Sequence, residues 1–143
     1  MKHTEGVFRS LLLLTATIAA LTLSACSAQQ MFGGPPKPKA EIAIIRGWGV
    51  DIISVNGSPV GVGSAGVVVL PGINNVVVRD NAANYNDLGD QNRVYAVPVL
   101  TGPGIEYAIT SKRGSPNVCA YPLDPASGEP MFDRPSGCFA QKP

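Results

Sequence analysis

The side chains with the widest range of possible chemistry in this chain are its three cysteines, Cys26, Cys119 and Cys138. A thiol can act as a nucleophile, bind a metal or form a disulfide, and its surroundings decide between these uses. Ser24 and Ala25 directly precede Cys26, and their small side chains leave the backbone open to a protease. The thiol of Cys26 therefore lies beside a candidate processing site, where it can be converted to a thioether.

Residues 1–25 have the composition of an export signal. Lys2 and Arg9 give the chain a basic start, and residues 11–23 consist of Leu, Ala, Thr and Ile, which is the pattern of a signal peptide. The motif Leu23-Ser24-Ala25-Cys26 at the end of this segment resembles the lipobox of bacterial lipoprotein precursors. The resemblance implies cleavage between Ala25 and Cys26 and attachment of acyl chains, palmitate among them, to Cys26.

An uncleaved membrane helix is the alternative interpretation of this segment. Residues 10–28 carry no charge and approach the roughly 20 apolar residues that a membrane span requires. The threonines of this stretch, together with Ser24 and Ser27, weaken a spanning helix but are compatible with a signal peptide.

The resemblance to the lipobox also implies that Ser27, in place of Asp, directs a lipoprotein of a two-membrane bacterium to the outer membrane. We therefore expect a protein of the cell envelope that is anchored to the lipid bilayer through Cys26.

The next segment has the composition of a tether. Gly33-Gly34 and Pro35-Pro36-Lys37-Pro38-Lys39 oppose regular structure, so we expect residues 26–40 to be flexible at first and then extended. Residues 41–143 are then one domain of ordinary size. The formal net charge of +1 gives no reason to expect nucleic-acid binding.

Short runs of Val, Ile and Tyr, separated by Gly, Pro and Asn, are typical of an all-β domain. No helical periodicity competes with them. Asn56-Gly57 predicts a turn, Pro71-Gly72 predicts a hairpin between two valine runs, and Gly102-Pro103-Gly104 separates another pair. The pattern indicates a sandwich or a small barrel, and we expect a small antiparallel β-sandwich. The expected strands are residues 41–46, 50–55, 66–70, 75–79, 93–100 and 106–112.

The turn residues carry a second resemblance. The combination of Val55-Asn56-Gly57, Leu70-Pro71-Gly72 and Gly104-Ile105-Glu106-Tyr107 resembles the PEGA-type, prealbumin-like β-sandwich modules of cell-surface proteins. The resemblance covers about residues 50–110. It implies a non-catalytic module outside the cytoplasm and supplies no site residues.

Cys119 and Cys138 remain once Cys26 is lipidated, and we expect them to form a disulfide because exported proteins mature in an oxidising compartment. The segment 120–137 between them contains several prolines, which disfavour a helix or an inner strand. One interpretation is a closed C-terminal loop that packs on the sandwich. The other is a rigid loop that presents aromatic and methionine side chains to a partner. Those side chains are Tyr121, Met131, Phe132 and Phe139.

Catalytic, metal and cofactor sites are not expected. The only histidine, His3, precedes the cleavage site, so a Ser-His-Asp or Cys-His nucleophile and a histidine-bound metal are excluded from the processed chain. Residues 61–66 match a dinucleotide-binding glycine pattern, but a strand-like valine run follows where that motif needs a helix. The oxygen-rich stretch at residues 80–90, with Asp80, Asp87 and Asp90, lacks the central glycine and final glutamate of a calcium loop.

The remaining carboxylates leave one enzymatic alternative. A pair of them is the catalytic requirement of a glycoside hydrolase, but no spacing in the sequence places two of them face to face. We therefore predict a protein that is not an enzyme. The carboxylates concerned are Asp51, Glu106, Asp124, Glu129 and Asp133.

Two functions are compatible with these observations. The first is an anchored envelope lipoprotein whose sandwich is structural or binds an envelope protein or a cell-wall glycan. The second is an inhibitor or immunity-type lipoprotein that acts through the Cys119–Cys138 loop. Outward-facing Tyr121, Phe132 and Phe139 would favour the second function, whereas their packing into the core would favour the first.

Overall fold

The computed structural model describes residues 28–80, 93–111 and 117–140. The predicted signal peptide, its cleavage site and the lipidation site at Cys26 lie outside these residues. The acidic stretch with Asp87 and Asp90 also lies outside them. Within the described part of the chain, no helix has the length and apolar composition needed to cross a membrane.

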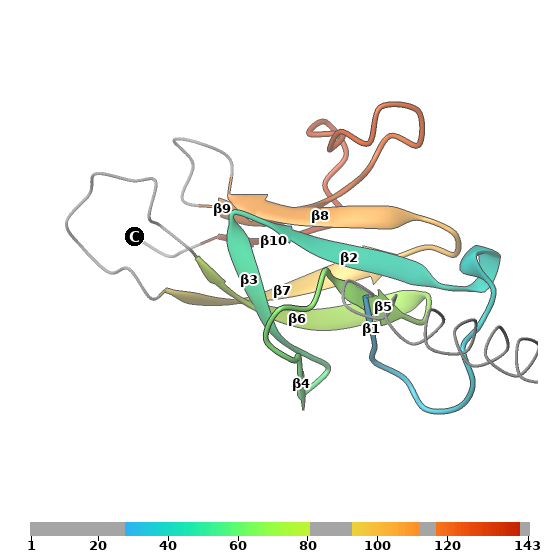
Figure 1. Ribbon diagram of the computed structural model, residues 1–143. Helices are drawn as coiled ribbons and strands as arrows, with labels where there is room; N and C mark the ends of the chain where they lie inside the picture. Colours follow the sequence, from blue (N-terminus) through green and yellow to red (C-terminus); the bar gives the residue numbers. More distant parts are fainter. Residues whose placement is uncertain (1–27, 81–92, 112–116, 141–143) are drawn as a thin grey trace, which may run out of the picture.

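The described chain is all-β, as predicted, and its strands form two sheets that pack face to face (Figure 1). Figure 1 shows β2 and β8 of the larger sheet above β6 and β7 of the smaller one. In spatial order the larger sheet contains β1 (Gln29–Gln30), β5 (Val67–Val69), β2 (Ala43–Trp48), β8 (Glu106–Ser111), β9 (Asn117–Pro122) and β10 (Gly137–Ala140). The smaller sheet contains β4 (Ser58–Pro59), β3 (Val50–Val55), β6 (Gly72–Asp80) and β7 (Val94–Thr101).

The core between the sheets is built by alternation along the strands. In β7 every second side chain is buried, and Tyr95, Val97 and Val99 point inward, as expected for a strand with one face on the core. Pro98 lies on the opposite face of β7, which is the edge strand of the smaller sheet, where a missing N–H group is tolerated. The largest fully buried side chains are aliphatic: Ile45, Val55, Val67, Val69, Val76, Val78, Val97, Val99, Ile109 and Val118.

The six predicted strand segments all contain a strand, and the range 50–55 is found unchanged as β3. The sandwich is not purely antiparallel, however, because β2 pairs in parallel with β8 and β1 pairs in parallel with β5. The Asn56-Gly57 turn is confirmed. It joins β3 to β4, and both residues have positive φ angles, 50° and 83°, a conformation that glycine and asparagine adopt most readily.

The hairpin predicted at Pro71-Gly72 is wrong. β5 pairs with β1 and β2 in the larger sheet, whereas β6, which follows the turn, pairs with β3 and β7 in the smaller one. The chain crosses between the sheets here, and two buried polar side chains stabilise the corner. The Asn74 amide donates hydrogen bonds to the Leu70 carbonyl (3.1 Å) and to the Thr101 hydroxyl (3.0 Å).

The start of the predicted tether is ordered and belongs to the larger sheet. Gln29–Gln30 pairs with Val67 and Val68 of β5, and the Met31 N–H donates to the Val68 carbonyl at 2.9 Å. The Met31 side chain packs against the core. The prediction of a flexible tether over residues 26–40 is therefore wrong for Gln29–Met31, because hydrogen bonding along β5 offsets the weak strand propensity of two glutamines.

Candidate functional site

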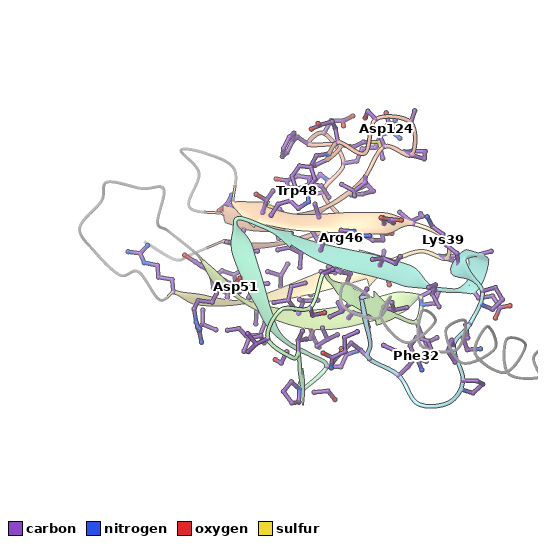
Figure 2. All side chains as sticks on the ribbon, viewed as in Figure 1. Phe32, Lys39, Arg46, Trp48, Asp51 and Asp124 are labelled. Atoms are coloured by element: carbon purple, nitrogen blue, oxygen red, sulfur yellow. A yellow bond between two sulfur atoms is a disulfide. The ribbon has the colours of Figure 1, made fainter. Side chains whose placement is uncertain are left out.

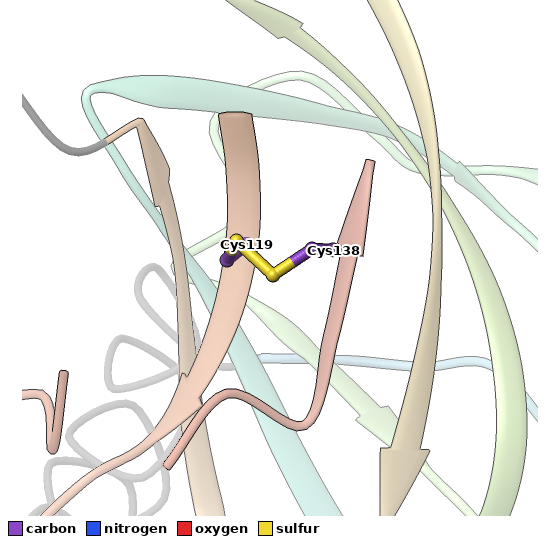
Figure 3. The surroundings of a disulfide bond; sticks show 2 residues. All are labelled: Cys119 and Cys138. Carbon is purple, nitrogen blue, oxygen red and sulfur yellow. A yellow bond between two sulfur atoms is a disulfide. The ribbon is translucent and has the colours of Figure 1, made fainter. Parts of the chain in front are cut away.

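The disulfide between Cys119 and Cys138 is present, and it joins two neighbouring strands (Figure 3). Cys119 of β9 lies directly opposite Cys138 of β10, with a Cα–Cα distance of 4.1 Å and an S–S bond of 2.08 Å. The bond closes the base of the segment between the two strands, residues 123–136, which we call the stapled loop. In Figure 1 this loop projects from the larger sheet above β8.

The prediction that residues 120–137 contain no inner strand is wrong at their start. β9 runs to Pro122 and lies between β8 and β10. The strand is possible because the first proline stands at its last position, so the remaining residues of β9 keep the N–H groups that the sheet needs. The other prolines of this segment lie in the stapled loop, outside the strand.

The stapled loop is held by its own hydrogen bonds. The Asp124 carboxylate accepts the Ala126 N–H at 2.7 Å, and the Asp124 carbonyl accepts the Gly128 N–H at 2.7 Å. The Asp124 N–H donates to the Glu129 carbonyl at 2.9 Å. An aspartate that bonds the backbone two residues further on is typical of a defined turn, so the stapled loop has a fixed shape.

Of the three aromatic residues considered for a binding loop, Tyr121 is buried and Phe139 is partly buried against the core. Tyr121 is only 6% exposed, and its ring meets the Phe132 ring edge to face at a centroid distance of 5.0 Å. Phe139 packs against the core and contacts the Tyr95 ring at 5.4 Å. Phe132 alone of the three is half exposed, at 51%. The Tyr121–Phe132 contact therefore attaches the stapled loop to the larger sheet, and the Tyr95–Phe139 contact joins β7 to β10.

A cluster of charged side chains lies beside the stapled loop on the outer face of the larger sheet. Glu106 at the start of β8 accepts a hydrogen bond from the Lys39 ammonium at 2.8 Å, and its other oxygen lies 3.5 Å from Nε of Arg46. Lys39 comes from the short 3-10 helix Lys39–Glu41, and Arg46 comes from β2. Figure 2 shows Lys39 and Arg46 along the larger sheet, with Trp48 further along β2. We call Lys39, Arg46 and Glu106 the charged cluster.

The charged cluster keeps the carboxylate of Glu106 ionised. The hydrogen bond from Lys39 lowers the pKa of Glu106 below its usual value, and the positive charges of Lys39 and Arg46 act in the same direction. Partial burial of the carboxylate raises the pKa, but this effect is the smaller one. The site can therefore present a fixed pattern of one negative and two positive groups.

A hollow of about 260 Å³ opens between the charged cluster and the stapled loop. Lys39 and Glu106 line one side, and Asp124 with its neighbours lines the other. Apolar contact is provided by Ile105 and Leu123. This hollow brings together two of the five carboxylates considered for catalysis, Glu106 and Asp124.

The other three carboxylates lie elsewhere. Glu129 and Asp133 are exposed on the stapled loop, and Asp133 pairs with Arg134 at 3.6 Å. Asp51 lines a second hollow, of about 460 Å³, between β3 and the glycine-rich residues 60–66. These glycine-rich residues lead into strand β5, as predicted, and not into a helix.

Sequence reasoning named Glu106 but missed its two partners. Lys39 belongs to the segment expected to be a tether, and Arg46 belongs to the expected strand 41–46. The alternation of Ala43, Ile44, Ile45 and Arg46 was the available signal, because an arginine two positions from the partly exposed Ile44 belongs to the outward face. No residues next to Lys39, Arg46 or Glu106 in the sequence indicate that these three side chains meet.

Within residues 28–80, 93–111 and 117–140, no group of three or more His, Cys, Asp or Glu side chains is placed to hold a metal ion. Comparison with known protein families, with curated proteins and with solved structures finds no match for this chain. The function must therefore be argued from the site itself.

Proposed function

We propose that this protein is an envelope lipoprotein, anchored in the membrane through Cys26, whose sandwich binds an envelope protein or a cell-wall glycan without catalysing a reaction. The motif Leu23-Ser24-Ala25-Cys26 supports the anchor. The observation that carries the binding role is the position of the charged cluster beside the disulfide-closed stapled loop. A site that is already ordered loses little conformational entropy when it binds.

The size of the hollow supports a macromolecular partner. Sites for whole small molecules usually enclose about 300–1,000 Å³, and the hollow beside Glu106 offers about 260 Å³. A space of this size suits one protruding group, such as a charged side chain or part of a sugar. Lys39 and Glu106, which line the hollow, then supply charge-assisted hydrogen bonds, which are stronger than those between neutral groups.

The electrostatics of Glu106 support binding over proton transfer. A carboxylic acid that donates a proton in glycoside hydrolysis needs a raised pKa. Lys39 and Arg46 instead lower the pKa of Glu106. The carboxylate is therefore suited to accept hydrogen bonds throughout the neutral pH range.

Phe132 supports the second candidate function, an inhibitor or immunity-type lipoprotein that acts through the stapled loop. It is a half-exposed aromatic side chain on a closed, projecting loop, and aromatic anchors often dominate protein interfaces. Tyr121 is buried and Phe139 is partly buried against the core, so neither adds to such an anchor. We therefore place the envelope-binding function first.

The experiment is a comparison of four proteins for binding to purified cell-wall sacculi and to envelope extracts. Glu106→Gln removes the charge of the central carboxylate with little change in shape, and Phe132→Ala removes the exposed aromatic ring. Glu129→Gln is the matched control on the stapled loop. We expect Glu106→Gln to lose the retention seen with the wild type and Glu129→Gln to keep it. Equal retention of the wild type and Glu106→Gln would contradict the assignment, and loss with Phe132→Ala alone would favour the inhibitor function.

A further inference from the structure

The first strand of the described residues, β1, begins close to Cys26 in the sequence. Gln29 already belongs to β1, so only Ser27 and Ala28 separate it from the cysteine. Three residue steps span at most about 11 Å in a fully extended chain. If Cys26 carries the acyl chains, as the proposed function requires, Gln29 must lie within that distance of the lipidated residue. The domain then has no long tether.

The surface around Gln29 is defined by three hydrogen bonds. The Gln29 N–H donates to the Gly66 carbonyl at 2.9 Å, and its side-chain oxygen accepts the Gly61 N–H at 2.7 Å. The side-chain amide donates to the Pro59 carbonyl at 3.4 Å. Gln29 is therefore bonded to both ends of the glycine-rich residues 60–66, which we call the glycine loop.

The glycine loop is itself uncharged, and the charged residues that line the hollow beside it are Asp51 and Arg79. Residues 60–66 contain no charged side chain. Val62 is fully exposed, and glycines flank it on both sides. An exposed aliphatic side chain loses no polar contact when it enters an apolar environment, and its transfer out of water is favourable.

The opposite edge of the larger sheet has a different character. β1 forms one edge and β10 forms the other. The stapled loop precedes β10 and carries Asp124, Glu129, Asp133 and Arg134. Three carboxylates against one guanidinium give the stapled loop a net negative charge, which the negative surface potential of a bilayer with anionic lipids repels.

We propose that the domain rests on the bilayer through the glycine loop, with Val62 at the contact and the stapled loop directed away from the membrane. This proposal depends on lipidation of Cys26, which fixes the β1 edge at the membrane. It follows that the charged cluster and its hollow, which adjoin the stapled loop, face the partner and not the lipid.

The test uses the full chain, processed in bacterial cells, purified and reconstituted into vesicles of phosphatidylethanolamine and phosphatidylglycerol. The Cys119–Cys138 disulfide and the modified Cys26 leave Val62→Cys as the only reactive thiol for an environment-sensitive fluorophore. Ala126→Cys, which is exposed on the stapled loop, is the matched control. Vesicles with brominated acyl chains then report whether the label contacts lipid.

We expect the label at residue 62 to shift its emission to shorter wavelength and to be quenched by the brominated chains, while the label at residue 126 changes in neither respect. Equal behaviour of the two labels, in protein that carries palmitate and floats with the vesicles, would overturn the orientation but not the anchor. Protein that lacks palmitate and does not float would overturn the proposed anchor and the orientation together. Unlabelled Val62→Cys should float like the wild type, because this side chain makes no core contact.

Discussion

Gly137 of β10 lies directly against the backbone carbonyl of Pro98 in β7, so that the two sheets meet at this point without a side chain between them. A Cβ atom at position 137 would overlap the Pro98 carbonyl oxygen. Next to this contact, the Leu100 N–H of β7 donates to the Ser136 carbonyl at 3.0 Å. These contacts join β7 and β10, which are edge strands of the two sheets, and they protect both strands from pairing with other chains.

Gly137→Ala should therefore destabilise the fold. The added methyl group has no space, and overpacking of this kind typically costs about 1–3 kcal/mol. Gly33→Ala is the control, because a Cβ at position 33 meets no atom within 4 Å, and we expect a change within about 0.5 kcal/mol. Urea unfolding followed by fluorescence of the single tryptophan, Trp48, measures both. Equal stability of the two variants would contradict the close contact.

The disulfide should protect both thiols and contribute to stability. We expect no alkylation of Cys119 or Cys138 in the exported protein before reduction. Replacement of either residue by Ser should lower the free energy of unfolding by about 2–5 kcal/mol, because the bond joins directly opposed residues of β9 and β10. Mass spectrometry after alkylation, with and without reductant, provides the first measurement, and urea unfolding provides the second. Free thiols in the unreduced protein would refute this prediction.

The strands that could be predicted are those whose own residues favour a β-strand. β3 and β7 were predictable because they are rich in Val, Ile and Tyr, which favour strands. β1 and β10 were not, because two glutamines and a Gly-Cys-Phe-Ala segment have little strand propensity of their own. β1 forms because it pairs with β5, and β10 forms because it pairs with β9 and is joined to it by the disulfide.

The sheet assignment of each strand was also beyond local signals. The turn at Pro71-Gly72 has the same residues whether it closes a hairpin or carries the chain between sheets. The buried bond between Asn74 and Thr101 stabilises the corner, and it joins residues that are 27 positions apart. The charged cluster is a similar case, because Lys39 and Glu106 are 67 positions apart.

Protonation of Glu106 should lower the stability of the folded protein in acid. The pKa of Glu106 is lower in the folded protein than the ordinary value of 4.5, so its ion pairs stabilise the folded state above about pH 4.5. This contribution is lost as the pH falls through the folded-state pKa. Glu106→Gln should therefore show a shallower loss of stability between pH 5 and pH 3 than the wild type, and Lys39→Ala should resemble it.

Urea midpoints at a series of pH values measure this effect. Glu129→Gln is the control, because Glu129 is exposed on the stapled loop, and its profile should follow that of the wild type. Parallel profiles for Glu106→Gln and the wild type would show that the charged cluster does not contribute to stability in acid.

Lipid anchoring should depend on the thiol of Cys26. Cys26→Ser removes the only thiol at the predicted cleavage site, so the variant should incorporate no radiolabelled palmitate and should yield no correctly processed protein. Stable anchoring requires more than one acyl chain, so the wild type should remain with the membrane fraction after a salt wash. Unchanged labelling of the variant would end the lipoprotein interpretation.

The last prediction concerns turnover. We expect the purified protein to show no hydrolysis of peptidoglycan glycans or other murein fragments. Typical enzymatic rate enhancements require about 8 kcal/mol or more of transition-state stabilisation, and this needs a nucleophile and base, or an acid with a raised pKa. Glu106 has a lowered pKa and is paired with Lys39 and Arg46, and Asp124 accepts a backbone hydrogen bond.

The assay compares the wild type with Glu106→Gln, Asp124→Asn and Asp51→Asn, which change the carboxylates that line the two hollows. Exposed Asp133→Asn serves as the control for contaminating activity, because a contaminant would act equally in every preparation. Reproducible turnover that Glu106→Gln or Asp124→Asn abolishes, and that Asp133→Asn leaves intact, would replace the binding function with a carboxylate hydrolase at the hollow beside the stapled loop. Turnover lost only with Asp51→Asn would move the active site to the hollow under the glycine loop, and binding by the charged cluster would then need its own test by the retention experiment.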